Sequence, residues 1–150
     1  MQNHTPTITE LQELALQLPE KIPYLKMLVL FGSRATGNAN AKSDWDFAVL
    51  CDEEQREAYI KNNISGLFEL PMLIGEVLKI NSDKIDIVEL NHCSELIAHF
   101  VARDGKVLYE SEAEEFEKFK QKVLLSKSEL KKIEHIKRQN IEQFLQRWGV

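Results

Sequence analysis

The chain has 150 residues, which is enough for one compact domain and too few for two ordinary ones. Hydrophobic residues make up 43% of the chain and charged residues 29%, a balance that argues against a disordered or membrane-spanning protein. The formal net charge of −5 argues against direct nucleic-acid binding, because duplex-binding proteins need a basic face to displace counterions from phosphates.

The first segments predict a helix, a strand and a loop. Leucines at helical spacing indicate a helix over residues 9–18, with Thr9 as its N-cap. The apolar run 26–31 (KMLVLF) favours a buried strand that stops at Gly32. The stretch 32–43 (GSRATGNANAKS) has no apolar period, so we expect a turn, a loop or a short irregular helix.

Residues 44–51 (DWDFAVLC) alternate in polarity, which predicts a strand. Successive side chains on a strand point to opposite faces, so Trp45 and Phe47 share one face. Asp44 and Asp46 share the other. The segment is therefore predicted to present two carboxylates side by side, away from the apolar face.

The middle of the chain continues with helix and strand. Residues 52–63 are charged and polar, and they predict an exposed helix or connection. Apolar residues at helical spacing predict a helix within 66–80. β-Branched residues and alternation then predict a strand over 84–90 (KIDIVEL), which carries a third acid, Asp86.

The last third combines a helix, a strand and a long amphipathic segment. Residues 94–102 predict a helix capped by Ser94, and 106–110 (KVLYE) predict a short strand. From 112 to about 148, apolar residues recur at helical spacing in a highly charged sequence. This pattern indicates a long amphipathic helix, with a break near 126–128 as the alternative.

Three carboxylates at matching positions on two strands predict a metal site. Asp44 and Asp46 project to one side of their strand, and Asp86 on a neighbouring strand can converge on them. Uncompensated carboxylates at one spot repel, so a cation between them is the natural arrangement. Oxygen ligands select hard cations, and two Mg²⁺ ions can activate an attacking hydroxyl and neutralise a leaving pyrophosphate. We therefore expect a site for two Mg²⁺ ions.

The end of the strand before this site predicts a phosphate-binding turn. Gly32 lets backbone N–H groups approach a phosphate closely, and the Ser33 hydroxyl adds a donor. Arg34 could add positive charge against a triphosphate, although a surface charge is an equally good interpretation. Each feature alone is weak evidence, because Gly-Ser pairs and Asp-x-Asp triplets are common. Their joint order along the chain is far more specific.

This order, written GSRATGNANAKSDWD, resembles the signature of the minimal nucleotidyltransferases of the polymerase-β-like superfamily: Gly-Ser, ten residues, then Asp-x-Asp. The flanking strands MLVLF and FAVL and the acid in KIDIVEL resemble the family too. The segment IAHFVARDGKVLYES is similar to the helix and strand that close these domains, particularly in antitoxins that accompany HEPT-domain toxins. The resemblance covers roughly residues 8–111. It departs at Thr36, where the family often has a second arginine.

The resemblance implies a role for each motif residue. Gly32 and Ser33 would bind the triphosphate of ATP, and Asp44 and Asp46 would hold the metals. Asp86 would be the third carboxylate, which takes a metal or the proton of the acceptor hydroxyl. The implied reaction is transfer of AMP from ATP to a tyrosine hydroxyl of a HEPT-type toxin. The chain would then be an antitoxin with the toxin as partner, in a hetero-oligomer.

Two other functions stay open at this point. A non-catalytic antitoxin would neutralise its toxin by occlusion, through the C-terminal helix. A small-molecule nucleotidyltransferase, such as one acting on aminoglycosides, usually needs an additional substrate domain, for which little chain is left.

The expected fold is α/β (α+β), the polymerase-β-like nucleotidyltransferase fold: a small mixed β-sheet with helices packed on one face and the metal site on the other. Residues 8–111 would form this domain, and 112–150 a C-terminal amphipathic helical extension. Cys51 and Cys93 lack the spacing of a zinc site and the density of a disulfide scaffold, so reduced thiols are expected. With no signal-peptide or membrane-spanning pattern, we expect a cytoplasmic protein without a membrane partner.

Overall fold

A four-stranded mixed sheet forms the centre of the computed structural model, which describes residues 5–62 and 70–147. The strand order is β3-β2-β1-β4; β1 runs antiparallel to both β2 and β4, and β2 runs parallel to β3. The predicted α/β class with a mixed sheet is thereby confirmed, and each predicted strand is present within one residue at either end. The strands are β1 (Leu25–Phe31), β2 (Trp45–Cys51), β3 (Ile85–Glu89) and β4 (Lys106–Glu110).

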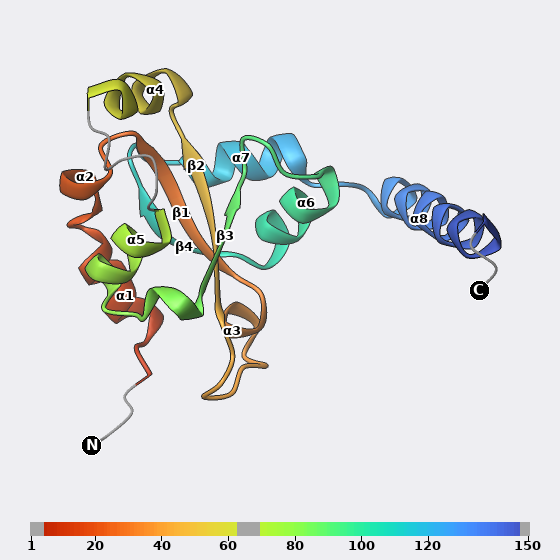
Figure 1. Ribbon diagram of the computed structural model, residues 1–150, viewed down its shortest axis with the longest axis horizontal. Helices are drawn as coiled ribbons and strands as arrows, with labels where there is room; N and C mark the ends of the chain where they lie inside the picture. The colour runs from red at the N-terminus through yellow and green to blue at the C-terminus, as the bar shows by residue number, and fades with distance from the viewer. Residues whose placement is uncertain (1–4, 63–69, 148–150) are drawn as a thin grey trace.

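Helices precede, connect and follow the strands (Figure 1). The predicted segment 66–80 is helical from Leu70 onward, and its first four residues lie outside the described part of the chain. The helices are α1 (Ile8–Ala15), α2 (Leu18–Lys21), α3 (Ser33–Thr36), α4 (Glu53–Asn62), α5 (Leu70–Leu78), the 3₁₀ turn η2 (Ser82–Lys84), α6 (Glu95–Asp104), α7 (Glu115–Val123) and α8 (Lys127–Arg147).

The helices α1, α2 and α5 cover one face of the sheet and form the larger core. The strand residues of this core include Trp45 and Phe47 of β2, as their alternation predicted. From the helices come the fully or almost fully buried Leu11, Leu18 and Ile74. Because burial of such side chains stabilises the fold by roughly 1.5–3 kcal/mol each, this face holds the sheet and the helices together.

The opposite face of the sheet is also covered, so the prediction of helices on one face only was wrong. The helices α6 and α7 pack there against Met27, Val29 and Ala48. The physical reason lies in the central strand β1, whose side chains from Met27 to Leu30 are all buried. A strand that is apolar on both faces needs a helical layer on each side.

The N-cap of the first helix lies two residues earlier than predicted, and the helix ends earlier as well, at Ala15. Thr7, not Thr9, is the N-cap: its hydroxyl accepts a hydrogen bond from the Glu10 N–H at 3.1 Å. The Glu10 side chain in turn accepts from the Thr7 backbone N–H, which completes a capping box. Thr7 and Glu10 have the threonine-to-glutamate spacing that a capping box requires, whereas Thr9 lies inside the helix.

The C-terminal segment forms two helices, α7 and α8, which confirms the alternative of a break near residues 126–128. The second begins with a capping box, in which the Glu129 N–H donates to the Ser126 hydroxyl at 3.1 Å and the Ser126 N–H donates to the Glu129 carboxylate at 3.2 Å. Helix α7 packs on the sheet through Phe116 and Phe119. The packed body therefore extends past the predicted domain boundary at residue 111.

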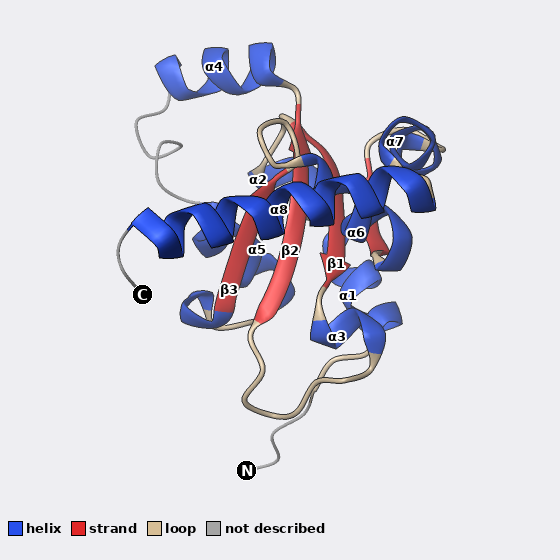
Figure 2. Cartoon of the chain, turned by 90° about the vertical axis from the view of Figure 1, so that its right-hand side faces the viewer, coloured by secondary structure: helices blue, strands red, loops and turns tan. Residues whose placement is uncertain are grey.

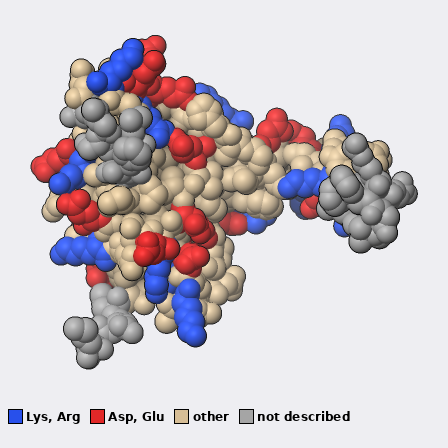
Figure 3. Space-filling view, viewed as in Figure 1, with Lys and Arg blue, Asp and Glu red and all other residues tan. Residues whose placement is uncertain are grey.

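Helix α8 stands apart from the body (Figure 1), and Figure 2 shows it from the side, in front of the sheet. Basic side chains are visible on it in the space-filling view (Figure 3), and Ile136 is 54% exposed. In the part of the chain that the structure describes, no helix has both the length and the apolar character needed to cross a membrane.

Candidate active site

The chain makes a tight turn where β1 ends. Gly32 follows the last strand residue with φ 73° and ψ −157°, a conformation that is essentially restricted to glycine. Its carbonyl accepts hydrogen bonds from the N–H groups of Ala35 (3.1 Å) and Thr36 (3.2 Å), which closes the single turn of α3. Gly37, also at positive φ, ends this turn. The two glycines thus encode a compact bend directly after a buried strand.

Ser33 is the first residue of α3 and is half-buried. The N–H groups in the first turn of a helix have no acceptor within that helix, so they can bind an anion together with a nearby hydroxyl. This placement agrees with the role predicted for Ser33, which stays a prediction.

Gly32 lies directly against the carboxylate of Asp46. Phe31 of β1 is paired with Asp46 of β2, so the turn begins beside this acid. A Cβ atom built at position 32 would overlap the Asp46 Oδ2 atom and lie 3.1 Å from its Cγ. Position 32 therefore requires glycine for its backbone conformation and for the space that Asp46 occupies. The structure brings the Gly-Ser turn and the second aspartate of the motif together.

Asp86 is the cross-strand partner of Asp46. The parallel pair β2–β3 places these two residues opposite each other, so their side chains lie on the same face of adjacent strands. The pKa of Asp46 is raised above its usual value, first by partial burial, then by the negative charges of Asp86 and Asp44. The carboxylates of Asp44 and Asp86 are therefore close enough to repel the charge on Asp46.

Asp44 lies in the loop before β2, because the strand begins at Trp45. Strand alternation therefore does not set the direction of the Asp44 side chain, contrary to the prediction. Among the described residues, no group of three or more His, Cys, Asp or Glu side chains is close enough to hold a metal ion. The predicted three-carboxylate cluster is thus only partly assembled: Asp46 and Asp86 are paired, and Asp44 approaches from a loop.

The chemistry of the acids nevertheless fits a hard cation. All three donors are carboxylate oxygens, which suit Mg²⁺. The repulsion that raises the pKa of Asp46 is the interaction that a cation would offset. Adjacent strands hold two of the donors, Asp46 and Asp86, in register.

Arg34 does not face these carboxylates. Its Nε and Nη2 atoms donate to the Ser43 carbonyl oxygen at 3.1 and 2.7 Å, and its guanidinium carbon lies 4.1 Å from the centre of the Trp45 ring. Trp45 points to the face opposite Asp46, because the two are neighbours on a strand. A direct contact of Arg34 with the nucleotide stays a prediction. In the structure, the Arg34 side chain binds Ser43 and contacts Trp45. Within the loop, the Ser43 hydroxyl accepts from the Asn40 N–H at 2.9 Å.

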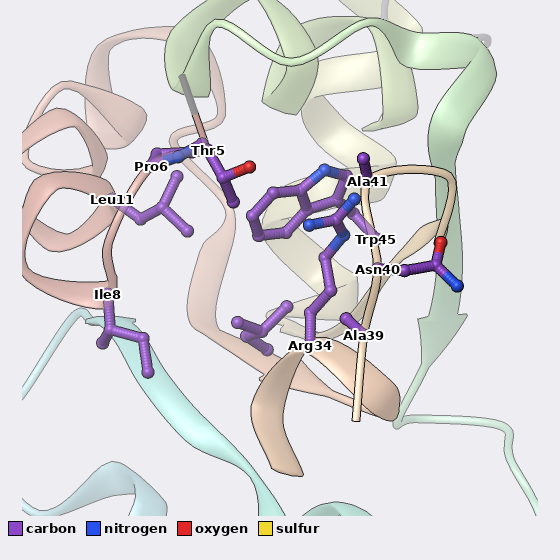
Figure 4. A pocket seen from close by; sticks show the side chains of 10 residues that line it. Thr5, Pro6, Ile8, Leu11, Arg34, Ala39, Asn40, Ala41 and Trp45 are labelled. Carbon is purple, nitrogen blue, oxygen red and sulfur yellow. The ribbon is translucent and has the colours of Figure 1, made fainter. Parts of the chain in front are cut away.

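A pocket of about 280 Å³ lies on the Trp45 side of the sheet (Figure 4). Because Trp45 and Asp46 point to opposite faces, this pocket is not the space above the carboxylates. The candidate active site is therefore the region around Gly32 and Asp46, and this pocket is not part of it. Its lining residues are Thr5, Pro6, Ile8, Leu11, Leu30, Arg34, Ala39, Asn40, Ala41 and Trp45.

The sequence prediction missed the contacts that hold the loop. Nothing in the pattern GSRATGNANAKSDWD indicates that Arg34 reaches the carbonyl of Ser43, because every residue offers a carbonyl acceptor. The side chain of Trp45 was assigned to the core correctly, but its stacking with an arginine eleven residues away has no sequence signal.

Comparison with known proteins places this geometry in a family. Residues 13–114 match the family described as "Polymerase beta, Nucleotidyltransferase". The chain belongs to this family. The matched region contains the Gly-Ser turn and all three acids. It also includes the whole sheet, so the predicted polymerase-β-like fold is confirmed.

The similarity extends to the whole chain in one relative. The protein adenylyltransferase MntA of Aphanizomenon flos-aquae (strain 2012/KM1/D3) is 71% identical over 150 residues, which are 100% of each chain. The predicted resemblance to a nucleotidyltransferase is thus confirmed by a relative that is named a protein adenylyltransferase.

Solved structures share the fold at low sequence identity. A toxin–antitoxin crystal structure with AMP-PNP has a chain that is 22% identical, with a TM-score of 0.52; the match covers 94% of this chain and 99% of that one. A tri-AMPylated Shewanella oneidensis HEPN toxin in complex with MNT antitoxin contains a chain that is 21% identical, with a TM-score of 0.50 and coverage of 93% and 99%.

Proposed function

We propose that the chain is a Mg²⁺-dependent protein adenylyltransferase that transfers AMP from ATP to a hydroxyl of a partner toxin, and so acts as its antitoxin. The observation that carries this proposal is the contact between Gly32 and Asp46, with Asp86 opposite Asp46 on the next strand. This contact supports the proposal because the Gly-Ser turn then lies beside two carboxylates. The partner is proposed to be a HEPT-type toxin and the acceptor a tyrosine hydroxyl.

The comparisons support the substrate and the acceptor class. The relative that matches along its whole length is named a protein adenylyltransferase. A fold relative was crystallised as a toxin–antitoxin with AMP-PNP, an ATP analogue, and another carries an AMPylated toxin in its complex. A cytoplasmic location agrees with ATP as substrate and with two free cysteines, Cys51 and Cys93.

Each residue of the site has a task in the proposed reaction. Gly32 and Ser33 bind the triphosphate through backbone N–H groups and the serine hydroxyl. Asp44, Asp46 and Asp86 would hold Mg²⁺, which supplies charge neutralisation of the phosphates and lowers the pKa of the acceptor hydroxyl.

The acceptor oxygen attacks the α-phosphorus, and the bond from that phosphorus to the bridging oxygen of the β-phosphate breaks. Pyrophosphate leaves with the electron pair of this bond. A carboxylate oxygen of Asp86 takes the proton of the acceptor hydroxyl, which it can do because the side chain is exposed on the active-site face.

The test is AMP transfer in the reconstituted pair. The chain is incubated with its co-purified toxin, labelled ATP and Mg²⁺, and we expect label on the toxin and a mass increase by whole AMP groups. The Asp44→Ala, Asp46→Ala double variant should give no label, because two metal-binding carboxylates are removed. Undiminished labelling by this variant would contradict the proposed site.

Neutralisation by occlusion is the second candidate, and the exposed apolar side chains of the C-terminal segment favour it. Leu124 and Ile136 are 45% and 54% exposed, so this segment offers apolar surface to a partner. Toxin activity in the presence of the double variant separates the two functions. Full neutralisation without label would establish occlusion, and an active toxin would establish that transfer is required.

A further inference from the structure

Arg34 connects two segments that together carry the site. It lies on α3, directly after Ser33, and its side chain is half-buried. Two of its nitrogens donate to the carbonyl oxygen of Ser43, at 3.1 Å from Nε and 2.7 Å from Nη2. Ser43 is the residue directly before Asp44. One side chain therefore ties the Gly-Ser turn to the start of the Asp-x-Asp segment.

The second contact of Arg34 holds the residue between the two aspartates. The guanidinium carbon lies 4.1 Å from the centre of the Trp45 ring, the geometry of a cation–π contact (Figure 4). Trp45 is only 6% exposed and stacks on Phe47, with ring centroids 6.2 Å apart and an interplanar angle of 12°. The ring is therefore a fixed surface, and Arg34 is anchored to the core of the sheet.

The loop that Arg34 closes depends on contacts of this kind. Residues 37–44 belong to no helix or strand, and they connect the turn to β2. Their own hydrogen bonds are local: the Lys42 N–H donates to the Asn40 side chain at 2.8 Å, and the Ser43 N–H donates to the Asn40 carbonyl at 3.0 Å. At the start of the loop, the Asn38 N–H donates to the Ser33 carbonyl at 3.0 Å and the Asn38 side-chain amide donates to the Thr36 hydroxyl at 3.1 Å. These bonds attach the start of the loop to α3 but do not fix residues 40–43 against it. The two bonds from Arg34 do.

We propose that Arg34 is a positioning residue for AMP transfer, which holds Asp44 and Asp46 in register with the Gly32–Ser33 turn, and that it is not a ligand of the triphosphate. The proposal rests on the proposed function. Its guanidinium lies on the Trp45 side of the strand, whereas Asp46 points to the other face. Two of its three guanidinium nitrogens, Nε and Nη2, already donate to the Ser43 carbonyl.

Lysine at position 34 distinguishes these two roles. A lysine keeps the positive charge but lacks the planar fork, so it cannot donate twice to one carbonyl while stacking on an indole ring. We call the two hydrogen bonds to Ser43 and the contact with the Trp45 ring the clamp. A contact with phosphate would tolerate the change from arginine to lysine better than the clamp would. We therefore expect Arg34→Lys to behave like the uncharged Arg34→Gln.

The experiment compares kcat and KM for ATP in the purified complex with the toxin. Both variants should lower kcat by about 10- to 100-fold, since displacement of a catalytic group by 1 Å costs up to about 100-fold, while KM changes by less than about twofold. Near-normal activity of Arg34→Lys, together with a KM raised about tenfold in Arg34→Gln, would overturn the proposal. Unchanged kcat in both variants would overturn it as well.

Arg103 offers matched control variants. It donates two hydrogen bonds to Asp104, at 3.0 and 2.7 Å, and lies 4.9 Å from the centre of the Phe100 ring, on α6. Arg103→Lys and Arg103→Gln thus remove the same kinds of contact without affecting a contact to Ser43 or Trp45, and they should leave kcat unchanged.

Hydrogen exchange tests the clamp without reference to catalysis. Amide exchange in residues 40–44 should accelerate in Arg34→Gln and Arg34→Lys relative to the parent chain, because this end of the loop loses its attachment to α3. Exchange that is unchanged in both variants would refute the clamp, even if the parent chain proved to transfer no AMP. Accelerated exchange in a chain without transferase activity would contradict the proposed function and leave the clamp standing.

Discussion

Substitution of Gly32 by alanine should impair both folding and catalysis, and the structure gives the size of each effect. At φ 73° and ψ −157°, a residue with a Cβ is strained by about 1–3 kcal/mol. For a chain of this length that corresponds to a fall in Tm of about 2–12 °C. The new Cβ also overlaps Oδ2 of Asp46, which must move by roughly 1 Å to reach an ordinary contact distance. Such a displacement lowers the transfer rate by about 100-fold.

Gly37→Ala is the matched control for this substitution. Gly37 also has positive φ, at 82°, so alanine there costs roughly 1–2 kcal/mol and lowers Tm by about 2–8 °C. A Cβ at position 37 meets nothing within 4 Å, so we expect its transferase rate to stay close to that of the parent. Thermal unfolding by circular dichroism and AMP transfer to the toxin measure the two effects. A Gly32→Ala protein with parental activity, or equal losses of activity in both variants, would refute the link between Gly32 and Asp46.

Three further predictions follow from the same site and from α8. Asp46→Asn should abolish transfer, yet it should raise the free energy of unfolding at pH 7. The folded-state pKa of Asp46 lies above the usual 3.8, so the ionised carboxylate lowers the stability of the fold once the pH rises through these two pKa values. The stability gained by Asn, measured in urea titrations, should therefore shrink as the pH falls toward 3.8. An advantage that grows on acidification would contradict this sign. Chelation of divalent ions with EDTA should stop labelling of the toxin, and excess Mg²⁺ should restore it; labelling that persists in EDTA would argue against a metal-dependent reaction. Removal of residues 127–150 should leave the Tm of the body within about 2 °C, since α8 stands apart from it, and a larger fall would reveal packing of α8 on the sheet.

Much of the local structure of this protein was predictable from the sequence. The strand Lys106–Glu110 has its predicted limits, and Ser94 caps α6 as expected. The alternation of Trp45 and Phe47 also predicted their burial in one core. These features depend on residues a few positions apart, where side-chain periodicity and capping chemistry act directly.

The sequence by itself also located the candidate site. The tolerance of glycine for a strained turn and the charge of aspartates near a strand depend only on residue type, so both can be recognised without a structure. Only the tertiary structure decided that Asp46 is paired with Asp86, that Asp44 precedes the strand, and that Arg34 closes the loop on Ser43. Those relations arise from pairing between strands distant along the chain and from contacts to backbone carbonyls. The pattern of residue types does not encode them, since strand register and carbonyl positions exist only once the sheet has formed.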